Sequence, residues 1–267
     1  QLNIPFQQLT SNHQVVHDSI SNPTKTQQLS PKSPSRNQPF AFNITPDGFH
    51  LLQADLRNDS TITLPLPPDV HYTITPSLAI FIPPNGQSPL IYLSGGKIKG
   101  KISQTILLLD THTIQWTKMK MMPQGRFSHG FVVSPEGFLW IIGGFSEDRV
   151  VNSCYRCGLG GEWEEIEELP MDCGGNGAIC YWTTTPGEYC VGCVSGYTAM
   201  LEQRVMVYNS SMSESELPLG EWTCFNVGQG ILPLKTRLQA FLWEQDEVLV
   251  LSSEGEICTI TFGGEMK

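Results

Sequence analysis

The chain has 267 residues, with 16 lysines and arginines against 26 aspartates and glutamates, so its formal net charge is -10. Taken as a whole, this is the wrong sign for a protein that coats nucleic acid or lies on an anionic membrane. Hydrophobic residues make up 40% of the chain and charged residues 16%. That composition supplies a core and excludes disorder throughout.

No run of about 18 apolar residues occurs, so we expect no membrane-spanning helix. Eight cysteines in 267 residues are too sparse for a disulfide scaffold, and a reduced, intracellular chain is the default expectation. Three Asn-x-Ser/Thr sequons, at Asn43, Asn58 and Asn209, leave a secreted, glycosylated protein open as an alternative.

The N-terminal segment, residues 1–37, is rich in Gln, Asn, Ser and Pro and poor in aromatic residues. We expect it to be loop-rich and to contribute strands to the first or the closing unit of the fold. From residue 38 to residue 267, short β-prone runs alternate with Gly, Pro, Asn and Asp, and no helical period is sustained. This pattern predicts an all-β domain. Its first strands are expected at 39–45, 49–52 and 61–64.

A motif then repeats along the chain. Residues 91–96 (IYLSGG) recur as residues 139–144 (LWIIGG), 48 residues later, and more weakly as residues 189–193 (YCVGC). A tryptophan follows each copy, at Trp116, Trp163 and Trp222, and the third unit carries an insertion of about ten residues before it. A fourth unit ends in residues 247–251, where Ser252 and Ser253 take the Gly-Gly position. With the strands before residue 65, five units are expected.

These residues, together with a Pro-x-x-Arg-x-x-His-Gly stretch at 123–130, resemble the kelch repeat, whose period is about 50 residues. The resemblance implies a kelch-type β-propeller of five recognisable blade units, completed to six blades by N- and C-terminal strands that close the ring. It also implies that the glycines form close turns and that the tryptophans fill the gaps between blades. The structural kelch positions would be Gly95, Gly96, Trp116, Gly143, Gly144, Trp163, Gly192 and Trp222.

Further stretches are more specific: residues 63–68 (TLPLPP), residues 216–220 (ELPLG), Cys224 and residues 228–230 (GQG). Their order resembles the kelch-like second subunit of the recombination-activating V(D)J recombinase and of RAG-like transposons. The resemblance implies a nuclear, non-catalytic accessory subunit in a two-plus-two heterotetramer. It would need no cofactor, because divalent metal is expected only on the catalytic partner. The chain is shorter than a complete propeller of that family, and no C-terminal PHD finger is recognisable.

Two other functions remain open at this stage. One is a generic kelch adaptor for ubiquitin ligation or cytoskeletal attachment, although no BTB-BACK region precedes residue 38. The other is a fragment of a secreted copper oxidase, for which the Tyr and His ligands cannot be assembled. No nucleophile elbow, P-loop or paired-carboxylate motif is present, so we expect no enzyme.

Charge is distributed unevenly. Residues 1–130 carry a net charge of +4, and residues 131–267 carry -14. We expect a local basic sector that contacts DNA backbone weakly and without reading bases. If residues 97–101 are extended, their three lysines would share one face; the alternative is an edge strand protected by lysine. The candidate contacts are Lys32, Arg36, Lys97, Lys99, Lys101, Lys118, Lys120 and Arg126.

We expect structural roles for an acidic run, two cysteine pairs and one histidine. The acidic run at 162–168 is expected to be a solubilising face, with a docking surface for a basic partner as the alternative. The pairs Cys154/Cys157 and Cys190/Cys193 have zinc-like spacing. However, positions i and i+3 of a strand face opposite sides, so packing of reduced thiols is expected rather than metal binding. His129 is expected to make hydrogen bonds between blades.

Overall fold

The computed structural model describes five runs of strands and the connections between several of them. The described residues are 40–45, 48–55, 58–64, 67, 72–74, 76–83, 87–147, 149–158, 160–174, 177–182, 189–195, 197–198, 204–209, 220–226, 238–244, 247–252 and 257–261. Within these ranges the chain is all-β, with antiparallel sheets and no helix. No helix long and apolar enough to cross a membrane was found among them. Residues 1–37, with Lys32 and Arg36, lie outside them.

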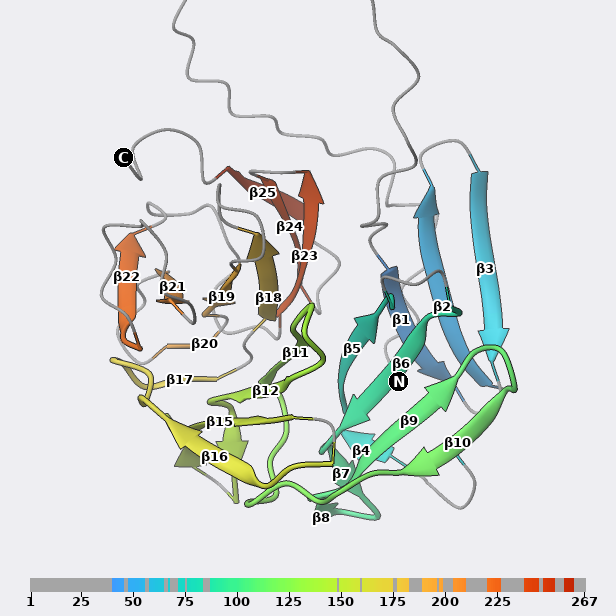
Figure 1. Ribbon diagram of the computed structural model, residues 1–267, viewed down its shortest axis with the longest axis horizontal. Coiled ribbons are helices and arrows are strands. Elements are labelled where there is room, and N and C mark those ends of the chain that lie inside the picture. Colours follow the sequence, from blue (N-terminus) through green and yellow to red (C-terminus); the bar gives the residue numbers. More distant parts are fainter. Residues whose placement is uncertain are drawn as a thin grey trace, which may run out of the picture.

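Five antiparallel sheets follow one another along the chain (Figure 1). Sheet 1 contains β1 (Phe40–Thr45), β2 (Gly48–Asp55) and β3 (Asn58–Leu64). Sheet 2 contains β5 (Ser77–Phe81), β6 (Leu90–Ser94), β9 (Ile106–Asp110) and β10 (Gln115–Lys118). Sheet 3 contains β11 (Gly130–Val133), β12 (Leu139–Ile142), β15 (Cys154–Cys157) and β16 (Trp163–Ile166).

Sheets 4 and 5 complete the described fold. Sheet 4 contains β18 (Gly177–Trp182), β19 (Tyr189–Val194), β21 (Arg204–Asn209) and β22 (Trp222–Asn226), and sheet 5 contains β23 (Leu238–Glu244), β24 (Glu247–Ser252) and β25 (Ile257–Thr261). In each sheet the strands pair in chain order. The first strands of sheets 2 to 5 contact one another in succession, β5 with β11, β11 with β18, and β18 with β23. Consecutive sheets therefore pack side by side through their first strands.

Small sheets lie beyond the second strand of sheets 2, 3 and 4. They are β4 (Tyr72–Ile74) with β7 (Lys97–Ile98) and β8 (Lys101–Ile102), then β13 (Phe145–Ser146) with β14 (Arg149–Val150), and β17 (Cys173–Gly174) with β20 (Tyr197–Thr198). In each case the segment that leads into the sheet's first strand pairs with the segment that follows its second strand; in sheet 3 this is an isolated bridge between Phe127 and Phe145. The repeats in the sequence are thus repeats in the structure.

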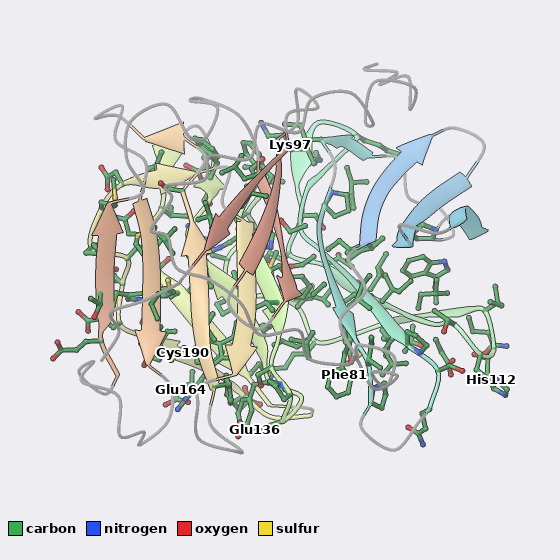
Figure 2. The ribbon with its side chains drawn as sticks, turned by 90° about the horizontal axis from the view of Figure 1, so that it is seen from above. Phe81, Lys97, His112, Glu136, Glu164 and Cys190 are labelled. Carbon is green, nitrogen blue, oxygen red and sulfur yellow. The ribbon has the colours of Figure 1, made fainter. Side chains whose placement is uncertain are left out.

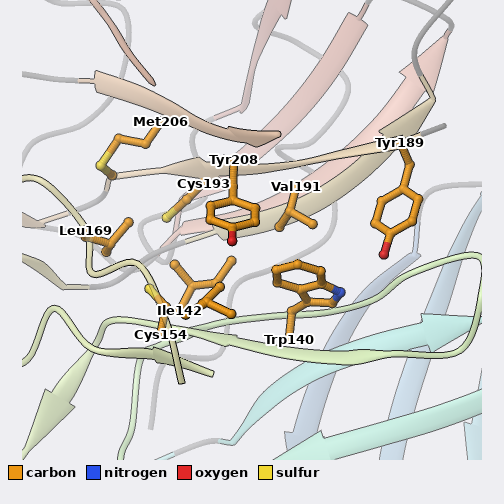
Figure 3. Close-up of a cluster of buried hydrophobic side chains, with 10 residues drawn as sticks. Trp140, Ile142, Cys154, Leu169, Tyr189, Val191, Cys193, Met206 and Tyr208 are labelled. Carbon is orange, nitrogen blue, oxygen red and sulfur yellow. The ribbon is translucent and has the colours of Figure 1, made fainter. Parts of the chain in front are cut away.

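The described core fills the spaces on both sides of sheet 3. One cluster joins sheets 2 and 3 and includes Ala79, Tyr92, Phe131 and Ile141, with Trp163 packed against it. Another joins sheets 3 and 4 (Figure 3) and includes Trp140, Ile142, Cys154, Tyr189, Val191, Cys193, Met206 and Tyr208. Sheet 3 therefore buries both of its faces, which explains why β12 is apolar at every position.

Four glycines of the repeat occupy left-handed backbone, with φ of +68° at Gly95, +83° at Gly96, +53° at Gly143 and +100° at Gly144. The space around these glycines also excludes a side chain. A Cβ on Gly95 would lie 2.1 Å from the Arg126 carbonyl oxygen, and one on Gly144 would lie 2.6 Å from the His129 Cβ. These two Gly-Gly turns follow β6 and β12 directly, as expected.

The Gly-Gly position of the third repeat was assigned wrongly. Gly192 lies inside β19, paired with Ile179 and Val207, and the strand continues to Val194. Val194 pairs with the first residue of β18, as Ser94 and Ile142 pair with the first residues of β5 and β11. The turn therefore begins at Ser195, which is buried. The assignment failed because a lone glycine within an apolar run does not by itself mark the end of a strand. Ser252 likewise still lies within β24.

We predict that Gly144→Ala destabilises the protein by more than about 2 kcal/mol, because the methyl group adds a steric clash to the left-handed backbone penalty. Gly160→Ala is the matched control, since Gly160 has φ of +75° and nothing within 4 Å of an added Cβ. It should cost only the backbone penalty, about 1 kcal/mol. Urea denaturation measures both, and equal losses would contradict the packing role of Gly144.

Candidate nucleic-acid interface

Three of the candidate lysines lie on one short hairpin, residues 97–102, which we call the lysine hairpin. Lys99, with φ of 50°, and Gly100, with φ of 78°, form its two-residue turn between β7 and β8. Positive φ at both central positions is typical of a type I′ turn. Lys97 pairs with Ile102 and Ile98 pairs with Lys101, so Lys97 and Lys101 lie on opposite faces of the ribbon. The expectation that the three lysines share one face is wrong, because the chain turns at Lys99.

The three lysines differ in exposure. Lys99 and Lys101 are exposed, whereas Lys97 is half-buried with its Nζ 4.5 Å from the centre of the Phe127 ring. The Phe127 ring stacks in turn on the ring of Phe145, with centroids 5.4 Å apart. Lys97 is therefore held at the root of the hairpin by a cation–π contact. The turn residue Lys99 and its neighbour Lys101 present their charge to solvent.

Lys118 and Lys120 lie at the outer edge of sheet 2. Lys118 is the last residue of β10 and is exposed. Lys120 forms an ion pair with Glu162 and donates a hydrogen bond to the Gly161 carbonyl oxygen at 3.1 Å. Its charge is thus largely offset by the neighbouring sheet.

Arg126 is not a surface residue. Its exposed fraction is 0%, so it offers nothing to a phosphate, and we remove it from the candidate contacts. Its Nη1 donates to the carbonyl oxygens of Gly143, at 3.1 Å, and Ser153, at 2.8 Å. Its Nη2 donates to the Ser153 hydroxyl and to the side chain of Gln124. Burial lowers the pKa of Arg126, and the guanidinium remains charged because its ordinary value is so high.

His129 makes the hydrogen bonds between sheets that the sequence predicted. Its Nε2 lies 3.0 Å from the Ser94 hydroxyl of sheet 2, and its backbone carbonyl oxygen accepts a hydrogen bond of 2.7 Å from Ser77. Its own Cα and Cβ lie against Gly144 of the sheet 3 turn. His129 is therefore a structural residue between two Gly-Gly turns.

Two tryptophans also join neighbouring sheets. The indole N–H of Trp163 donates to the Met121 carbonyl oxygen at 2.8 Å, beyond the end of sheet 2. Trp222 of sheet 4 repeats this with the Glu167 carbonyl oxygen, beyond the end of sheet 3, at 2.9 Å. Trp116 occupies the corresponding outer strand of sheet 2 and is half-buried. Trp163 and Trp222 thus each contact the end of the preceding sheet.

Sheet 3 has a hairpin at the position that corresponds to the lysine hairpin, and this hairpin is acidic instead of basic. Residues 145–150, which we call the acidic hairpin, carry Glu147, Asp148 and Arg149. The side chain of Glu147 is 80% exposed, its backbone φ is 55°, and its Oε2 forms a long ion pair of 4.0 Å with Arg149 of the same hairpin. This hairpin was not among the candidates from the sequence, although its position directly after the second Gly-Gly could have indicated it.

The acidic run also has a defined place. Glu164 and Glu165 are exposed on β16, the outer edge strand of sheet 3, and Glu164 pairs with Arg156 at 2.7 Å. The hydrogen bond from Arg156 lowers the pKa of Glu164. The charged strand borders the same sheet as the acidic hairpin, so sheet 3 presents mainly negative charge.

The cysteines of the two pairs are buried. Cys154 and Cys193 pack in the cluster between sheets 3 and 4, and the Cys154 thiol donates to the Asn152 carbonyl oxygen at 3.3 Å. Cys190 is buried but does not belong to that cluster, in agreement with its place three positions before Cys193. Among the described residues, no group of three or more His, Cys, Asp or Glu is arranged to hold a metal ion.

Comparison with models of known protein families gave no match, and no curated protein matches the chain. Function is therefore inferred from this chain's own residues and geometry.

We predict that Arg126→Lys lowers the free energy of unfolding by about 3 kcal/mol, because lysine cannot reach both carbonyl oxygens with a planar fork and leaves buried acceptors unpaired. Arg149→Lys is the control, since the Arg149 side chain is 77% exposed. Its expected effect is within about 0.5 kcal/mol. A loss at position 126 no greater than at position 149 in urea denaturation would contradict the buried network.

A second prediction concerns the thiols. Burial raises the pKa of Cys154 to about 12 and also raises that of Cys157. Since the thiolate is the reactive form, neither thiol should be alkylated by iodoacetamide in the native protein at pH 8. Both should be alkylated in 8 M urea, as read by peptide mass spectrometry. Rapid native alkylation of Cys154 would show that the space between sheets 3 and 4 is open.

Proposed function

We propose that the chain is a kelch-type β-propeller that serves as the non-catalytic accessory subunit of a RAG-like DNA recombinase or transposase. In this role it binds and activates the catalytic subunit, in a two-plus-two heterotetramer, and contacts the backbone of flanking DNA in the nucleus. Metal and cleavage chemistry belong to the partner. The N- and C-terminal strands close the ring as a sixth blade. The succession of sheets 2 to 5 through their first strands is compatible with this architecture.

The observation that carries the DNA-contacting role is the lysine hairpin. Its two exposed lysines stand in the half of the chain with net charge +4, while the corresponding hairpin of sheet 3 is acidic. The two hairpins occupy equivalent positions in the repeat and therefore have the same place in the fold. Since folding makes the same demand on both, we attribute their difference in charge to function. Exposed lysines next to a solvent-accessible turn suit phosphates, which are contacted by charge and not by sequence.

The opposite end of sheet 2 supports a protein-binding role. There Ile114, 44% exposed, adopts φ of 55° in the loop between β9 and β10, and Ile82 after β5 is 42% exposed. A β-branched residue in left-handed backbone is unusual, and such outliers cluster at functional sites. Figure 2 shows Lys97 and His112, a neighbour of Ile114, at opposite ends of sheet 2. DNA and protein partners would thus occupy different ends.

The same observation favours a second candidate function, a generic kelch adaptor that binds protein alone through its loops. In that case the exposed isoleucines matter and the lysine hairpin does not. The two functions therefore differ in which end of sheet 2 is required.

The test is co-expression with a RAG-like catalytic subunit, followed by purification and a DNA cleavage assay. We expect the two chains to co-purify and Ile114→Asp to weaken the association. A Lys99→Glu, Lys101→Glu variant should co-purify normally but lower cleavage by about tenfold. Failure to co-purify would reject the accessory role. Normal cleavage by the double variant would favour the adaptor.

A further inference from the structure

We infer that two neighbouring hairpins fix where a DNA backbone lies on this protein. The lysine hairpin holds the phosphates through Lys99 and Lys101, and Glu147 of the acidic hairpin keeps them off sheet 3. This inference rests on the proposed contact with DNA. It adds that the DNA backbone passes over the lysine hairpin and away from sheet 3. The ligand is the phosphodiester backbone of duplex DNA, contacted without regard to sequence.

The two hairpins adjoin at their roots. Lys97 begins the first hairpin and Phe145 begins the second, and the Phe127 ring lies between them, 4.5 Å from the Lys97 Nζ and 5.4 Å from the Phe145 ring centre. The backbones of Phe127 and Phe145 exchange two hydrogen bonds of 3.0 Å each. The roots of the two hairpins are therefore close enough for charges there to interact at physiological salt, where the range is about 8 to 10 Å, and we infer that Glu147 influences a phosphate held at the lysine hairpin.

Both hairpins place a charged residue where the backbone is strained. Lys99 has φ of 50° and Glu147 has φ of 55°, whereas Asn or Gly is preferred at such turn positions. Neither charge is required for the turn itself. An unfavourable residue retained at an exposed tip is a marker of function, and here the two tips carry opposite charges.

Most other cations of this region have partners. Arg126 is buried among carbonyl oxygens, Lys120 pairs with Glu162, and Lys97 lies over Phe127. Arg149 of the acidic hairpin lies 4.0 Å from Glu147, and Lys118 is exposed at the outer edge of sheet 2, away from the hairpin. Lys99 and Lys101 remain as the exposed cations of the lysine hairpin. Two phosphate contacts predict weak binding whose logarithm falls with the logarithm of salt concentration with a slope of about -2.

The test measures binding of the full chain to a fluorescent duplex by anisotropy at several salt concentrations. The double variant Lys99→Asn, Lys101→Gln should weaken binding at least about fivefold at low salt and bring the slope close to zero. Asparagine suits the left-handed turn, so urea denaturation should show this variant to be as stable as the parent. Unchanged affinity in a folded double variant would overturn the inference.

A second set of variants reverses the charge at Glu147 of the acidic hairpin. Glu147→Lys should raise affinity about threefold or more and make the salt slope steeper by about 1. Glu165→Lys is the matched control, because it makes the same change of charge at an exposed position of β16. Equal gains at 147 and 165 would show that binding follows net charge alone, and would overturn the proposed path. The accessory role is tested separately, by co-purification with the catalytic subunit without DNA.

Discussion

The structure depends on the placement of one buried cation between two turns. The carbonyl oxygen of Arg126 accepts a hydrogen bond from Gly96 N–H at 3.0 Å, and its guanidinium donates to the Gly143 carbonyl oxygen at 3.1 Å. Arg126 thereby connects the Gly-Gly turn of sheet 2 to that of sheet 3. Apolar packing between sheets is strong but has no direction, whereas a guanidinium fork bonds in fixed directions. The arginine sets the register in which sheets 2 and 3 pack.

The charged and titratable residues fall into two groups. Arg126 and His129 are buried and make hydrogen bonds between sheets 2 and 3, where an unpaired polar group would be costly. Lys99 and Glu147 stand on turns that need no charge, and Lys101 directly follows the first of these turns. Equivalent hairpins of successive sheets share a backbone plan and differ in charge, and we therefore propose that the hairpins carry the contact with DNA. The same division explains why a net charge of -10 is compatible with a local phosphate-binding element: the acidic excess belongs mainly to other parts of the chain.

The sequence predicted the architecture better than the site. Hydrophobic runs that end in Gly-Gly identified β6 and β12. The tryptophans expected between units lie on the outer strands β10, β16 and β22, where packing between repeated sheets constrains the sequence. Gly192 misled because its apolar run extends two residues further. Arg126 was wrongly predicted to lie on the surface, because nothing in the surrounding polar sequence indicates that it is buried. Its burial becomes evident only from the carbonyl oxygens that it contacts across the fold. The lysines at 97, 99 and 101 misled because their alternation matched a strand while Lys99-Gly100 formed a turn.

Site-specific cross-linking tests the central claim most directly. A photoreactive amino acid placed at position 99, in the chain assembled with a duplex and the RAG-like catalytic subunit that we propose as its partner, should cross-link to DNA, while the same group at position 165 should not. Cross-linking at 165 but not at 99, or only to protein from position 99, would contradict the assignment of the lysine hairpin to the DNA backbone.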